Sequence, residues 1–90
     1  MPTVFTLHGI RFVVWPNDHA PPHAHAIGAG WEIKVGLGDC EHIKPWLMEV
    51  TGSPTTRQLR RVLLTVDQHC AALAAAWRDS AVLGRPGGAP

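Results

Sequence analysis

The segment with the most potential chemistry is residues 17–25, which hold three of the six histidines. If the segment ends in a strand, His23 and His25 lie two positions apart and point to the same face. Two imidazoles on one face can share a metal ion, and His19 or Asp18 on the preceding loop can supply a third ligand. Three protein ligands with one open position are typical of a catalytic site for zinc or a similar divalent transition metal.

Two interpretations without a metal stay open. His23 and His25 can act in general acid–base catalysis, because the imidazole pKa lies near neutrality, or can help to bind a phosphate. A histidine that follows two prolines can also be structural and fix its loop by a hydrogen bond to a carbonyl. The sequence has no zinc-finger spacing of cysteines and histidines, no His-x-x-x-His motif with an intervening Glu and no glycine-rich phosphate loop. Whether the protein is an enzyme is therefore left open.

Three arginines, Arg57, Arg60 and Arg61, fall in the first turns of a predicted helix, where cations oppose the helix dipole. Residues 1–52 carry three basic and five acidic groups, whereas residues 53–90 carry five basic and two acidic groups. Arg57 and Arg61 are candidates for an anion site that takes a phosphate, a nucleic-acid backbone or an acidic partner. The alternative is a solvated helix face, with an arginine folded back onto an acidic strand residue.

Apolar periodicity predicts the elements that position these groups. Alternating residues indicate strands over residues 4–7, 10–15, 23–27 and 31–37, and residues 45–50 are expected to add an edge strand. An apolar stripe from Leu59 to Trp77 indicates a helix. Thr55 and Gln58 form its capping box, and Gly84 ends it. The predicted fold is α+β: a small antiparallel sheet of four to five strands, followed by one long C-terminal helix packed on one face.

Composition bounds the class of protein. The 90 residues are 46% hydrophobic with a net charge of +1, which excludes a disordered chain and gives little support to nucleic-acid binding. We expect one domain over residues 1–83 and a flexible Gly/Pro tail over 84–90. No membrane span and no export leader are found, so we expect a cytoplasmic protein with Cys40 and Cys70 reduced. Trp15 and Trp46 are predicted to form exposed contact patches for a partner.

The motif Pro21-Pro22-His23-Ala24-His25, with Asp18-His19 before it and Met1-Pro2 at the start, resembles a small bacterial family called domain of unknown function 4160 (DUF4160). The resemblance covers about residues 1–80. It implies a cytoplasmic bacterial protein encoded beside a small partner protein of the DUF2442 type, in a toxin–antitoxin-like or regulatory gene pair. The family motif singles out Asp18, His19, Pro21, Pro22, His23 and His25 in this chain.

Two functions from different classes follow as hypotheses. The first is a protein-binding or regulatory module that associates with itself or with the small partner protein. The second is a metal- or histidine-dependent hydrolase or nuclease. In the second, His23 and His25 serve as ligands or as acid and base, His19 or Asp18 completes the site, and Arg57 and Arg61 hold a phosphate.

Overall fold

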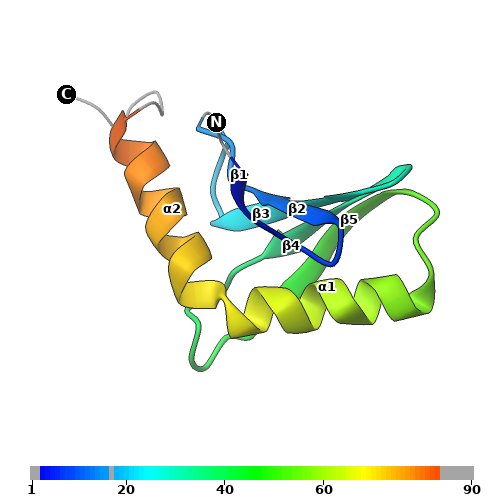
Figure 1. Cartoon of the computed structure of the whole chain (residues 1–90). Helices are drawn as coiled ribbons and strands as arrows, with labels where there is room; N and C mark the ends of the chain where they lie inside the picture. The colour runs from blue at the N-terminus through cyan, green and yellow to red at the C-terminus, as the bar shows by residue number, and fades with distance from the viewer. Residues whose placement is uncertain (1–2, 17, 84–90) are drawn as a thin grey trace.

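Five strands form one antiparallel sheet in which each strand pairs with the next along the chain (Figure 1). The computed structural model describes residues 3–16 and 18–83, with side chains as far as residue 80. The strands are β1 (Thr3–Leu7), β2 (Ile10–Val13), β3 (His23–Gly28), β4 (Trp31–Gly36) and β5 (Trp46–Gly52). The predicted sheet is confirmed, although β2 is two residues shorter than expected. The predicted tail, residues 84–90, lies outside the described residues.

Tight turns fix the register of the sheet. His8 and Gly9, which join β1 to β2, have φ values of 55° and 73°, as the primed turns of hairpins require. The β3–β4 turn contains Gly30 at φ 81° and closes on the pair Gly28 and Trp31. Because this turn is so short, every side chain of β3 has a fixed neighbour on β4.

The hydrophobic core lies on one face of the sheet. Phe12, Ala26 and Ile33 are neighbours on three adjacent strands and are almost completely buried. Val62 and Leu73, from the two helices that follow the sheet, pack in the same cluster. Strand residues one position away face the other side of the sheet, so the alternation that builds the core also points the histidines of β3 away from α1.

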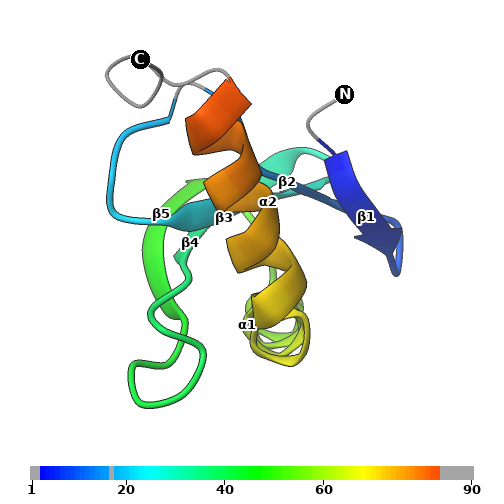
Figure 2. The same ribbon diagram turned by 90° about the vertical axis from the view of Figure 1, so that its left-hand side faces the viewer.

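The prediction of one long C-terminal helix is wrong: the structure has α1 (Thr56–Gln68) and α2 (Cys70–Leu83), which meet at His69. His69 has φ −114° and ψ 21°, outside the helical region. A straight helix of the combined length would run about 42 Å, whereas five strands span about 19 Å. The corner lets α1 stay beneath the sheet while α2 turns along the end where β3 begins (Figures 1 and 2). Within the described part of the chain, neither helix is long and apolar enough to cross a membrane.

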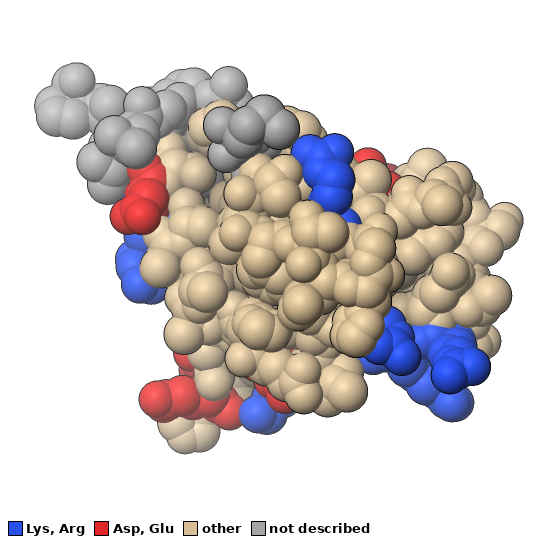
Figure 3. All heavy atoms as spheres, in the orientation of Figure 1, with Lys and Arg blue, Asp and Glu red and all other residues tan. Residues whose placement is uncertain are grey.

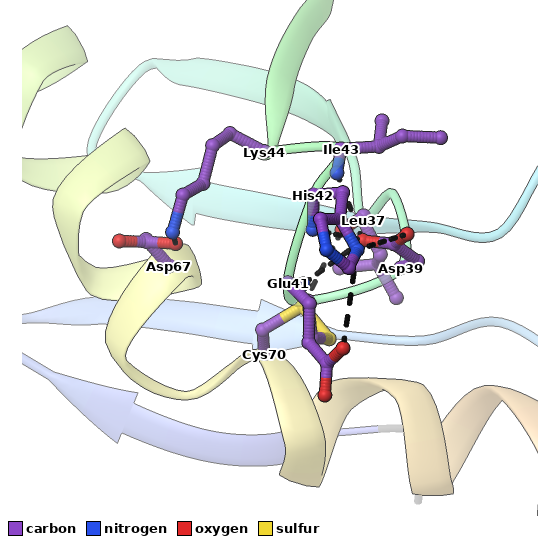
Figure 4. The surroundings of a disulfide bond; sticks show 9 residues. Leu37, Asp39, Glu41, His42, Ile43, Lys44, Asp67 and Cys70 are labelled. Atoms are coloured by element: carbon purple, nitrogen blue, oxygen red, sulfur yellow. Dashed lines mark hydrogen bonds and ion pairs between the residues drawn. A yellow bond between two sulfur atoms is a disulfide. The ribbon is translucent and has the colours of Figure 1, made fainter.

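Cys40 and Cys70 form a disulfide, so the prediction that both are reduced is wrong (Figure 4). The two residues are 30 positions apart in the sequence, and their Cα atoms are 5.6 Å apart. The corner between the helices places Cys70 against the loop that leaves β4. The bond therefore ties this loop to the start of α2.

Asp39 organises the same loop. One of its carboxylate oxygens accepts hydrogen bonds from the backbone N–H groups of Glu41, His42 and Ile43, at 2.9, 2.8 and 2.8 Å (Figure 4). The bond from Ile43, followed by those from the other two amides, lowers the pKa of the Asp39 carboxyl below its ordinary value. The ionised carboxylate thus holds Cys40 in a compact turn.

Candidate metal centre

β3 and the loop before it bring three ligand-type side chains together. His23 and His25 lie on one face of β3, as predicted, with the buried Ala24 between them. Asp18 reaches them from the loop: its Oδ2 atom lies 3.1 Å from Nε2 of His23 and 3.0 Å from Nε2 of His25. One ligand atom from each of the three residues lies within 4.8 Å of the others. Two imidazoles and one carboxylate form a donor set that divalent transition metals favour.

Each histidine uses its other ring nitrogen to hold its orientation. Nδ1 of His23 lies 2.8 Å from the carbonyl oxygen of Pro21. A carbonyl only accepts hydrogen bonds, so this nitrogen carries the proton and the neutral ring has its lone pair on Nε2. Nδ1 of His25 lies 2.7 Å from Oε2 of Glu32 on β4. Carbonyl and carboxylate partners of this kind orient the imidazoles of metal sites.

Protonation of the histidines does not give every one of the three convergent ligand atoms a hydrogen-bond partner. An imidazolium at His25 would donate to both Asp18 and Glu32. It would leave Nε2 of His23 as it stands: a buried atom for which residues 3–16 and 18–80 supply no hydrogen-bond partner. The Asp18 oxygen lies 3.1 Å from that nitrogen without the geometry of a hydrogen bond, so in the neutral ring a lone pair faces a carboxylate oxygen. A cation between the three ligand atoms would satisfy all of them.

Burial keeps His23 neutral. Its side chain is only 3% exposed. This burial lowers the pKa of the imidazole below its ordinary value of 6.5, although the hydrogen bond to Pro21 and the nearby Asp18 carboxylate act in the opposite direction. Trp77 of α2 covers the ring, with 5.1 Å between the ring centroids. The nitrogen is therefore held in the unprotonated form that metal ions require.

The geometry fits a bound metal ion. Ligand atoms about 2.0–2.2 Å from a tetrahedral zinc ion lie about 3.3 Å from one another, close to the separations between Asp18 and the two histidines. The residue types also fit, because imidazole and carboxylate ligands suit zinc and non-haem iron alike. Three protein ligands leave at least one position of a four-coordinate ion for water or substrate.

The structure separates the two candidates for the third ligand. Asp18 points into the cluster, whereas His19 is exposed and lies outside the group of convergent ligand atoms. The hydrogen bond from His23 to the Pro21 carbonyl is the kind of structural contact that the sequence left open for a histidine after two prolines, whereas Glu32 was missed. A signal for Glu32 was present: the two-residue turn pairs Ile27 with Glu32, which places this carboxylate on the face that His25 occupies.

The predicted anion-binding residues lie elsewhere. Arg57 and Arg61 line a hollow with Gly28 and Trp31, at the end of β3 opposite to His23. The six residues of β3 separate the two places by about 17 Å. The hydrolase hypothesis assumed that the arginines and the histidines share one site. The structure instead places them at opposite ends of β3.

The two tryptophans predicted as contact residues are exposed in part. Trp15 is 37% exposed, and its ring centroid lies 6.4 Å from that of His25. Trp46 is 39% exposed and lies over Gly36, the β4 residue that pairs with His23. Both indoles therefore border the histidine cluster as well as the solvent.

Comparison with known proteins gives a family and no activity. Residues 9–78 match the family described as "Domain of unknown function (DUF4160)". This match confirms the resemblance found in the Pro-Pro-His-x-His motif, and it contains all the residues of the candidate centre. No curated protein and no solved structure matches the chain.

Proposed function

Because the chain belongs to the DUF4160 family, whose description assigns no activity, we propose a function from its own side chains: Asp18, His23 and His25 bind one divalent transition metal ion in a hydrolytic centre. The observation that carries the proposal is Nε2 of His23, a buried nitrogen without a hydrogen-bond partner among the described residues, beside Asp18 and the second imidazole. An ion held with an open position polarises a substrate oxygen or lowers the pKa of water.

The chain's own residues supply the rest of the centre. Glu32 fixes the His25 ring, and the carbonyl of Pro21 fixes the His23 ring, so neither imidazole has to be ordered when the ion binds. Trp77 covers His23 and excludes water from that side. Asp18 and Trp15 are 26% and 37% exposed, more than either histidine, so we expect a substrate to approach from their side.

Metal content is the decisive measurement. Elemental analysis of the purified, untagged protein is expected to show near-stoichiometric zinc, iron or a similar ion, retained through dialysis. The variants Asp18→Asn and His23→Ala/His25→Ala should lose it. His19→Ala is the matched control, because His19 lies on the same loop and outside the cluster. Absence of metal even after loading, or equal loss in His19→Ala, would contradict the proposal.

The absence of bound metal would favour a structural or acid–base role for the histidines. A structural role predicts that His23→Ala/His25→Ala is destabilised, since removing a buried hydrogen-bonding partner costs about 1–3 kcal/mol. Unfolding by urea, measured on the metal-free proteins, separates the two cases. A metal centre predicts that the difference between wild type and variant is larger with metal than without it, because the hydrogen bond to Pro21 contributes in both states.

A second candidate function is the protein-binding module of a toxin–antitoxin-like pair, with a DUF2442-type protein or a second copy as partner. It is supported by β5, an edge strand whose Trp46, Leu47 and Val50 are each more than a third exposed. Edge strands with apolar side chains can add a strand from another chain. Light scattering after gel filtration, on the protein alone and with the partner protein, tests this function. Leu47→Lys should abolish the association. Leu64→Lys, which changes an exposed leucine of α1, should retain it. The cytoplasmic location also stays a prediction.

A further inference from the structure

A basic groove lies at the opposite end of the sheet from the histidines. We define the arginine groove by His8, Arg57, Arg60 and Arg61. These residues line two adjoining hollows of about 540 and 260 Å³, which share His8, Arg57 and Arg61. Figure 3 shows a cluster of Lys and Arg side chains at the end of the molecule where α1 begins. The groove therefore has both a concave shape and a single sign of charge.

The three arginines of the groove are not paired with carboxylates in the described part of the chain. Within residues 3–16 and 18–80, no carboxylate lies within 4.0 Å of Arg57, Arg60 or Arg61. The alternative from the sequence, in which an arginine folds back onto an acidic strand residue, is therefore not supported. The first turn of α1 contains no acidic residue that would offset them. Each cation near a helix N-terminus opposes the helix dipole and costs a few tenths of a kcal/mol.

The helix start does not need the arginines or an anion. The backbone N–H of Gln58 donates to the Thr55 hydroxyl at 3.1 Å, and the N–H of Thr55 donates to the Gln58 side chain at 2.7 Å. This capping box is the one predicted from the sequence. The ligand-binding capacity of the groove thus rests on the guanidinium groups, which extend over the hollows.

The chemistry of the groove points to phosphate esters. All three cations are arginines, whose planar guanidinium forms paired hydrogen bonds to phosphate, and none is a lysine. Residues 57, 60 and 61 lie on one side of a helix, so their side chains can contact neighbouring phosphate groups. Ile10 and Trp31 also line the larger hollow. Its volume of about 540 Å³ falls within the range of small-molecule binding sites. Two arginines, Arg57 and Arg61, lie beside the small exposed parts of Ile10 and Trp31 in this hollow, an arrangement that suits a nucleobase next to its phosphates.

We infer that the arginine groove binds the phosphate groups of nucleotides, either as free nucleoside di- or triphosphates or as a nucleic-acid strand. This site is separate from the metal centre, because the length of β3 lies between them. Binding at the groove therefore requires neither a metal ion nor any of Asp18, His23 and His25.

Fluorescence anisotropy with a short labelled single-stranded oligonucleotide, and with a labelled nucleoside diphosphate, tests the inference on the full chain. The variant Arg57→Gln/Arg61→Gln should weaken binding of at least one probe by about tenfold or more for each arginine. Arg78→Gln is the control for the single variant Arg57→Gln, since each removes one arginine charge from an exposed position and Arg78 lies on α2, away from the groove. Circular dichroism and metal content verify that the variants remain folded.

The two sources of phosphate give different results. A strand should lose affinity with salt, and the slope of log K against log salt should fall by about one for each arginine removed. A free nucleotide should compete far better than inorganic phosphate at equal concentration. Binding that Arg78→Gln weakens as much as Arg57→Gln does, competition by inorganic phosphate as strong as by the nucleotide, or binding of neither probe overturns the inference. Asp18→Asn should leave binding unchanged, so that failure of the metal proposal is seen separately.

Discussion

The polar side chains at the two ends of the sheet differ in whether the protein itself supplies their partners. At the histidine end, the imidazoles are enclosed and each finds an internal partner, Pro21 or Glu32. Nε2 of His23 is buried and has no hydrogen-bond partner among the described residues. At the arginine end, three cations share a concave surface, and none of them contacts a carboxylate of the described residues. The histidine end thus presents side chains that the protein already holds in place, whereas the arginine end presents cations that no described carboxylate neutralises.

The connections explain the difference. Two-residue turns close the sheet at the arginine end, and they are too short to cover anything. The chain at the other end runs through a long loop before β3 and a second loop after β4. The Cys40–Cys70 disulfide ties this second loop to α2. Only this end has enough chain to bury an ionisable group.

Removal of the disulfide should give the largest effect. For a sequence separation of 30 residues, the chain-entropy model predicts a loss of about 3.5 kcal/mol in the free energy of unfolding for Cys40→Ser. Urea unfolding with and without a thiol reductant measures it. The reductant should destabilise the wild type by a similar amount and leave the variant unchanged. Equal stability of oxidised and reduced wild type would show that the bond does not secure the histidine end.

A crossed thermal-shift experiment tests whether the two ends act independently. Zinc or another bound ion at about 100 times its dissociation constant should stabilise the wild type by about 2.7 kcal/mol, and Asp18→Asn should lose this gain. A bound nucleotide should stabilise Asp18→Asn as it does the wild type. Arg57→Gln/Arg61→Gln should show the reverse pattern. If either variant removes both responses, the two ends are not separate sites.

A matched pair of glycines compares packing at the two ends. A methyl group at Gly28 would overlap the ring of Trp31, and one at Gly36 would overlap the ring of Trp46. Trp31 is 8% exposed and has to shift within the core, whereas Trp46 is 39% exposed and can rotate into solvent. We expect Gly28→Ala to cost about 1–3 kcal/mol and Gly36→Ala less, measured by urea unfolding. The opposite order would mean that Trp46 is the more firmly held ring.

The smallest effect concerns acid stability of the loop that holds Cys40. The pKa of Asp39 is lowered in the folded protein, so the carboxyl stabilises the fold above its ordinary pKa of 3.8. That contribution disappears as the pH falls through the lower, folded-state value. Asp39→Asn should therefore reduce the melting temperature at neutral pH and flatten its decline in acid. An unchanged acid profile would show that the three backbone hydrogen bonds do not depend on the charge.

The sequence was sufficient for the features that depend on local periodicity. Alternation along residues 23–27 predicted that His23 and His25 share a face, and the apolar stripe with its capping box predicted helix from residue 56 onward. The loop residues were harder, because the direction of a side chain in an irregular segment has no period. Asp18 and His19 were equal candidates in the sequence, and only the path of the loop selects Asp18.

Long-range features were missed for a different reason. The corner at His69 has no glycine or proline to mark it, and the apolar stripe continues through both helices. Without that corner, Cys70 would not be expected beside Cys40. The assignment of reduced thiols depended on cellular compartment, which contains no information about how near two sulfurs lie. Glu32 was predictable in principle from the short turn, once the strand register was worked out.

The sheet is a simple meander, and this has a consequence for the order of folding. Every side chain that forms or orients the candidate centre belongs to the segment from Asp18 to Glu32, one loop and the first residues of a hairpin. Contacts so close in sequence need only short loops to close, and during synthesis these residues are made before both helices. The helix that carries Trp77 arrives last and dehydrates an imidazole already in position. If Asp18, His23 and His25 bind an ion as proposed, this order of synthesis exposes the ligands to water before Trp77 covers His23.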